Sequence, residues 1–216
     1  MNSQVGINEF VAMMDGAIQQ VKYGERYLSE LDSACGDGDH GITMLRAVNR
    51  VNETLAKPEK TDLKSLVYDI GWTLHGVDGG ATGPLLGTLF LGMSESLEGR
   101  ESLDPTGLAQ MFEGGLHAVE KQTKARVGDK TMIDALAPAV ATLRASADRG
   151  GDVPDMLRNA ADAAQQGATT TRDFVAKFGK AKHSAERSLG HQDAGATSIA
   201  MIFRGFYEGF TKLKAV

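Results

Sequence analysis

The residues of this chain that could do chemistry lie closest together between Asp32 and Gly41. Three carboxylates, those of Asp32, Asp37 and Asp39, fall within eight residues, with glycines among them. Aspartate and glycine are typical of turns, and glycine lets the backbone approach a ligand closely. Because three like charges repel one another at short range, the stretch needs a positive partner. Divalent ions such as Mg²⁺ prefer oxygen ligands, so a metal is the simplest candidate.

The start of the next helix adds a possible anion site to this acidic stretch. Gly41 to Thr43 are expected to open that helix, where free N–H groups and the helix dipole favour a negative ligand. A phosphate there would face Asp37 and Asp39, and Mg²⁺ between them would remove the repulsion. The pattern therefore predicts a metal–phosphate ligand; the alternative is a solvated acidic turn. His40 could contact a phosphate, a base or a metal, or make ordinary hydrogen bonds.

Other glycine and metal motifs do not explain the stretch. Gly36-x-Gly38-x-x-Gly41 has the spacing of the dinucleotide fingerprint, but that motif needs a strand before it and a βαβ unit around it. The P-loop lysine is absent. An EF-hand beginning at Asp37 would place Val48 where a bidentate glutamate is required.

Two further loops contain residue types suited to a ligand. The small residues of Gly79-Gly80-Ala81-Thr82-Gly83 suit close approach to a phosphate or nucleoside, or a tight helix–helix turn. Asp193, just before the last helix, could be a cap or a ligand contact. A basic cluster upstream could neutralise phosphates, hold a lid or belong to a solvated loop; it comprises Lys177, Lys180, Lys182, His183 and Arg187.

The spacing of apolar residues indicates helices throughout the chain. Apolar residues recur at steps of three and four in eight segments, and no convincing strand pattern is present. We expect the first helix over Ile7 to Leu31, the last over about Ala196 to Lys214, and a long polar loop over Phe178 to Ala194. Trp72 is expected in the core, with a partner surface as the alternative. Residues 1–216 are predicted to form one all-α domain.

The expected connections bring the unusual loops together. Short connections favour antiparallel neighbours, so alternate loops lie at the same end of a helical domain. The loops after the first, third, fifth and seventh helices are the acidic stretch, the Gly79 loop, the loop over Thr123 to Thr131, and the Phe178 to Ala194 segment. We therefore expect these four loops to form one site.

Composition excludes several classes of partner. The chain has 216 residues and a formal charge of −5, which argues against a general nucleic-acid or anionic-membrane surface. Cys35 is its one cysteine, which suits a reducing compartment. No secretory signal is visible, and the most apolar segment, Leu85 to Met93, is too short to span a bilayer. We expect a cytoplasmic protein that binds neither nucleic acid nor membrane.

Four loop segments together resemble those of a known family. They are Gly36-Asp37-Gly38-Asp39-His40-Gly41, Gly79-Gly80-Ala81-Thr82-Gly83-Pro84, Gly128-Asp129-Lys130-Thr131-Met132, and Glu186 to Ser198. In order and separation they resemble the nucleotide-binding L subunit of dihydroxyacetone kinase over nearly the whole chain. The resemblance implies a barrel of eight antiparallel helices with the nucleotide at one end.

The resemblance also implies a ligand set. ADP or ATP would be bound with two Mg²⁺ ions, which Asp32, Asp37 and Asp39 would hold. Phosphates would lie along His40, Gly41, Ile42 and Thr43, and the nucleotide would contact Gly80, Ala81 and Thr82. Thr123 and Met132 would lie near the base, and Asp193, Ala194 and Gly195 would close the site. Lys180 replaces an arginine that contacts phosphate in the family, and Ala194 replaces a proline.

By the same resemblance the chain is a subunit of a two-component sugar kinase of glycerol metabolism. A separate K subunit would hold the sugar, dihydroxyacetone or a related triose or tetrose, through a covalent bond to a histidine. The phosphoryl donor would be exchangeable ATP, or bound ADP rephosphorylated by a phosphoenolpyruvate-dependent relay protein of a phosphotransferase system. The alternative is a nucleotide-bound regulatory partner of a transcription factor. The number of chains stays open, with a homodimer as one option.

Overall fold

The computed structural model describes residues 4–57, 62–97 and 99–215. Eight long α-helices and one short one lie within these ranges, and an isolated bridge between Val5 and Leu103 is the extent of β pairing there. The predicted all-α class is therefore confirmed. The α-helices are α1 (Ile7–Cys35), α2 (His40–Leu55), α3 (Leu63–His75), α4 (Thr82–Glu95), α5 (Pro105–Gln122), α6 (Ile133–Asp148), α7 (Val153–Thr170), α8 (Ala185–Ser188) and α9 (Ala194–Lys214).

Aspartates fix the starts of four long helices. Each accepts a hydrogen bond from the backbone N–H three residues further on, which satisfies a donor that the first turn leaves free. A proline in the first turn of α5 and of α7 suits these starts, because its missing N–H is not needed there. The capping residues are Asp62, Asp104, Asp152 and Asp193.

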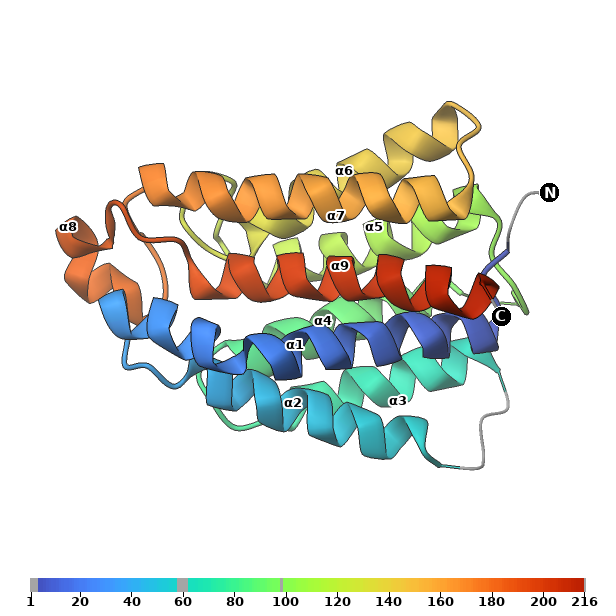
Figure 1. Cartoon of the computed structure of the whole chain (residues 1–216), viewed down its shortest axis with the longest axis horizontal. Coiled ribbons are helices and arrows are strands. Elements are labelled where there is room, and N and C mark those ends of the chain that lie inside the picture. The colour runs from blue at the N-terminus through green and yellow to red at the C-terminus, as the bar shows by residue number, and fades with distance from the viewer. Residues whose placement is uncertain (1–3, 58–61, 98, 216) are drawn as a thin grey trace.

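The long helices pack as a ring of neighbours. Each of α1 to α6 contacts the next helix, while α9 packs against both α7 and α1. Figure 1 shows these helices running side by side along the long axis. At the crossing of α1 and α9, a methyl group on Gly16 would overlap the backbone of Gly205, so glycine permits the close approach. This order of contacts agrees with the predicted barrel, which stays a prediction.

The core is apolar and rich in phenylalanine, but it does not include Trp72. The buried stripe of α3 comprises Leu63, Leu66, Val67, Ile70 and Leu74. Trp72 lies on the opposite side of that helix with 53% of its surface exposed, edge-on to the rings of Tyr68 and His75. The expectation of a core position was wrong, because residue 72 is out of phase with the apolar stripe.

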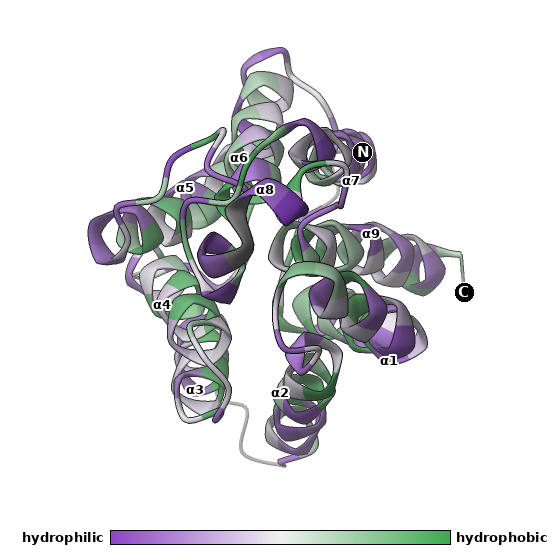
Figure 2. Ribbon diagram, turned by 90° about the vertical axis from the view of Figure 1, so that its left-hand side faces the viewer, coloured by the Kyte–Doolittle hydropathy of each residue, from purple (hydrophilic) through white to green (hydrophobic). Residues whose placement is uncertain are grey.

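Two element boundaries differ from those expected. Helix α1 continues to Cys35, one turn beyond Leu31, so Asp32 lies in a helical turn rather than in the loop. The Phe178 to Ala194 segment contains two short helices, the 3₁₀ helix η2 (Lys180–Ser184) and α8. Both contact α1 and lie across the end of the molecule that faces the viewer in Figure 2.

Of the described helices, none is both long and apolar enough to cross a membrane.

Candidate functional site

A cavity of about 290 Å³ lies where four loops meet. Its lining comes from the loops after α1, α3, α5 and α7, which confirms that the four unusual loops converge at one end. Most of the residues predicted for the site take part in this lining. They are Asp32, Asp37, Asp39, His40, Gly80, Ala81, Thr82, Thr123, Met132, Lys180, Asp193, Ala194 and Gly195.

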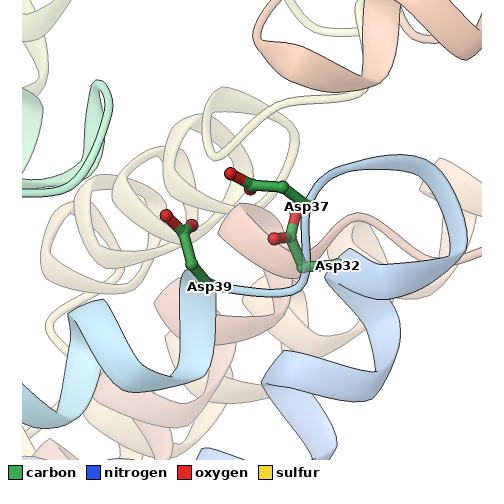
Figure 3. Close-up of side chains that lie close together, drawn as sticks. All are labelled: Asp32, Asp37 and Asp39. Carbon is green, nitrogen blue, oxygen red and sulfur yellow. The ribbon is translucent and has the colours of Figure 1, made fainter.

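The three carboxylates predicted to hold a metal lie together. Asp32 comes from the last turn of α1, Asp37 from the connecting loop, and Asp39 is the N-cap residue of α2. One oxygen from each lies within 4.8 Å of the others, and Figure 3 shows the side chains gathered around one point. A compact set of hard oxygen donors suits Mg²⁺, so the residues present fit that ion.

Asp32 also shapes the loop that carries the other two carboxylates. Its Oδ2 accepts hydrogen bonds from the backbone N–H of Gly38 at 2.8 Å and of His40 at 3.4 Å. Gly38 has a φ of 80°, a conformation that glycine adopts without strain. A substitution at Asp32 would therefore disturb the loop as well as the carboxylate cluster.

Lys180 reaches this cluster from the opposite wall. Its Nζ donates a hydrogen bond to Asp37 and lies 3.3 Å from Oδ2 of Asp39. The hydrogen bond from Lys180 lowers the pKa of the Asp37 carboxyl, and the same bond raises the pKa of Lys180. The carboxylate cluster therefore already attracts one cationic group of the chain itself.

His40 links three parts of the site through its ring. Its Nε2 lies 3.2 Å from the hydroxyl of Ser198, and its Nδ1 lies 3.4 Å from that of Thr82. Ser198 in turn donates to the carbonyl of Gly195 at 2.8 Å. Burial lowers the pKa of His40, which favours the neutral ring. Both ring nitrogens face hydroxyl groups, so the structure favours a positioning role for His40 over that of a metal ligand.

Three predicted phosphate-lining residues lie outside the cavity lining. Gly41 packs so tightly against Glu25 and Ser29 of α1 that a side chain would overlap them. Ile42 is half exposed, and the N–H of Thr43 donates to the carbonyl of Asp39 within the helix. Packing of α2 against α1 thus explains the glycine at position 41.

Apolar side chains from several helices complete the cavity lining. They come from α4, from the start of α6 and from α9, and they offer a surface for a flat apolar group such as a nucleobase. Met132 and Thr123, predicted near the base, belong to the same lining. These apolar residues are Leu85, Leu86, Ile133 and Ile199.

Asp134 and Lys130 make hydrogen bonds that hold one wall of the cavity, although no role was predicted for either residue from the sequence. Asp134 is buried and accepts hydrogen bonds from the N–H groups of Gly128 and Thr131, at 2.6 and 2.7 Å. Lys130 lies in the cavity lining. Its Nζ donates to the carbonyl of Thr171, which precedes the Phe178 to Ala194 segment, and to the carbonyl of His191, which lies near the end of that segment. The Gly-Asp-Lys run marked the loop, but no local pattern indicated these partners.

Asp193 is half-buried at the start of α9. Loss of solvent around its carboxyl raises the pKa of that group to about 7, although the N–H of Ala196 donates to it at 2.7 Å. Lys130 is buried, and burial lowers the pKa of its ammonium group. Close to neutral pH, the Asp193 side chain is therefore poised between its neutral and charged forms.

We expect Asp193→Asn to flatten the pH dependence of stability in the absence of metal. The folded state keeps the proton of Asp193 up to about pH 7, while the unfolded chain releases it near 3.8. The folded state thus binds more protons between about pH 4 and about pH 7, so wild-type stability falls as pH rises through that window. Asparagine cannot ionise and still offers an oxygen to Ala196. Urea unfolding across this range in EDTA measures the effect; parallel curves for both proteins would contradict it.

Similarity to known proteins extends over most of the chain. Residues 34–208 match the family model described as DAK2 domain. The chain is 37% identical over 190 residues to "PEP-dependent dihydroxyacetone kinase 1, ADP-binding subunit DhaL" of Listeria innocua serovar 6a, covering 88% of this chain and 90% of that one. It is 39% identical over 178 residues to the "PEP-dependent dihydroxyacetone kinase, ADP-binding subunit DhaL" of Escherichia coli K12, covering 82% and 85%.

A solved structure has the same arrangement of helices. The dihydroxyacetone kinase from C. freundii in complex with AMP-PNP and Mg²⁺ matches with a TM-score of 0.73 and 29% sequence identity. The match covers 96% of this chain and 35% of that one, so this chain corresponds to about a third of the larger protein.

Proposed function

This chain belongs to the DAK2 domain family, and we propose that it is the ADP- or ATP-binding subunit of a two-component dihydroxyacetone kinase. The family predicted from the four loop segments is confirmed. The observation that carries the proposed function is the cluster of Asp32, Asp37 and Asp39 in the wall of a cavity with apolar lining. The relatives do not favour the regulatory alternative, because they are kinases and kinase subunits by name.

Different parts of the cavity lining would bind the metal ions, the phosphates and the base. The carboxylate cluster would hold two Mg²⁺ ions, which when bound neutralise charge on the phosphate oxygens. The first turn of α2 would donate N–H groups to phosphate, and His40 would keep Thr82 and Ser198 in place. The apolar lining would receive the base, with Met132 at its edge. Catalysis would then come from positioning and charge neutralisation.

The sugar and the phosphoryl source belong to partners in this proposal. A sugar-binding K subunit would present dihydroxyacetone, or a related triose or tetrose, at the open end of the cavity. A phosphoenolpyruvate-fed relay protein would restore the phosphoryl group on bound ADP; free ATP is the alternative source. A single domain over residues 1–216, a homodimer and a cytoplasmic location stay predictions.

A reconstituted assay tests the proposed function. This chain, ATP, Mg²⁺ and a K subunit loaded with dihydroxyacetone should together form the sugar phosphate, and omission of any one should prevent it. A second arm replaces ATP with ADP, phosphoenolpyruvate and the relay proteins. Nucleotide binding without sugar phosphate in either arm would contradict the catalytic role and favour a regulatory one.

A further inference from the structure

Lys180 contacts two of the three carboxylates of the cluster, those of Asp37 and Asp39. Its Nζ lies within hydrogen-bond distance of an oxygen of Asp37 and of Asp39, the same groups that close around the cluster with Asp32. These contacts join parts of the chain more than 140 residues apart, from η2 on one wall to the α1–α2 loop on the other. The ammonium group is therefore delivered to the cluster by the fold, not by local sequence.

The part of the chain between Arg172 and Gly190, which carries Lys180, is held by contacts near both of its ends. Lys177 is fixed twice to Asp129, by its backbone N–H and by an ion pair at 2.7 Å. The N–H of Gly190 donates to the carbonyl of Arg172, which brings the two ends of the segment together. Between these anchors, Gly179 has a φ of 64°, so the chain turns sharply immediately before Lys180. Lys180 is thus held near the cluster even when its ion pairs break.

A divalent ion at the cluster would bind the same two carboxylates that Lys180 contacts. The ion would then lie close to the ammonium group, and the two positive charges would repel each other. One ammonium charge offsets only part of the charge of three carboxylates, so the cluster still attracts a dication. Because Lys180 is tethered to the same molecule, its local concentration is high and constant.

We propose that Lys180 is an intramolecular competitor of the metal at Asp37 and Asp39. The ammonium group offsets part of the carboxylate charge when no metal is bound and is displaced when a metal enters. This inference rests on the proposed metal site and adds a residue that sets its apparent affinity. It makes the free metal bind more weakly than the carboxylates alone would allow.

Binding of Mn²⁺ without nucleotide tests the competition, with free Mn²⁺ followed by electron paramagnetic resonance. Lys180→Met should bind Mn²⁺ about fivefold more tightly than the wild type, the size expected when two exposed ion pairs no longer compete. Lys180→Arg keeps a cation at this position and should restore weak binding. The matched control is Lys182→Met, which removes an exposed lysine of the same segment that lies outside the cavity lining; its affinity should equal that of the wild type.

Two results would overturn the competition. Equal or weaker Mn²⁺ binding by Lys180→Met, in a wild type that binds the ion, would overturn it and leave the proposed function intact. Failure of every variant and of the wild type to bind Mn²⁺ would overturn it together with the metal site. Lys180 is exposed and makes its ion pairs at the surface, so loss of the fold is not expected to obscure either result.

Discussion

Replacing Asp37 and Asp39 together with asparagine should weaken Mg²⁺-dependent ADP binding by about 100-fold or more. Both carboxylates point into the cluster, and without their charge the remaining Asp32 cannot offset a metal and a phosphate together. Asparagine keeps the size of each side chain. Calorimetric titration of the double variant with ADP in the presence of Mg²⁺ measures the loss.

The double variant should fold normally, which makes its binding defect interpretable. Asp37 is exposed, and the side chain of Asp39 makes no capping hydrogen bond to α2. A control with the same change in charge combines Asp69→Asn on α3 with Glu53→Gln on α2, two exposed acids outside the cavity lining. The control should bind as the wild type does. Wild-type affinity in Asp37→Asn with Asp39→Asn would show that the cluster does not serve the nucleotide.

Asp134→Ala should have the largest effect on stability, about 3 kcal/mol. The carboxylate of Asp134 is 2% exposed and receives the N–H groups of Gly128 and Thr131. Alanine would leave both partly buried donors without this acceptor, and a loop that forms one wall of the cavity would lose its support. Urea unfolding at neutral pH measures the change in the free energy of unfolding.

Asp148→Ala, at the opposite end of α6, is the matched control. Its side chain is mostly exposed and pairs with Arg144 at 3.7 Å, so its loss should cost well below 1 kcal/mol. If Asp134→Ala were no less stable than Asp148→Ala, the buried carboxylate would not be what holds the loop.

The sequence was sufficient where the signal was local. The apolar periodicity located the helices, because amphipathicity depends on residues a few positions apart. Alternating short connections then predicted that four loops meet, which the cavity confirms. The carboxylate cluster was visible for the same reason, since Asp32, Asp37 and Asp39 lie within eight residues.

The parts that the sequence could not predict depend on contacts between distant segments. Nothing near Lys180 indicates that it reaches Asp37, and nothing near Lys130 indicates two carbonyl partners across the cavity. The close packing of Gly41 against α1 was likewise not indicated by the residues around it. Trp72 is a different case: it looked like a core residue by type, but its phase relative to the apolar stripe of α3, a local pattern, turns it outward.

The central claim is that the acidic loop holds a nucleotide through Mg²⁺. Titration of the purified chain with ADP, once with Mg²⁺ and once with EDTA, tests it most directly. We predict saturable binding of one ADP per chain with Mg²⁺ and little or none with EDTA, because the carboxylates repel bare phosphates. Absence of binding with Mg²⁺, or equal binding with EDTA, would contradict the claim.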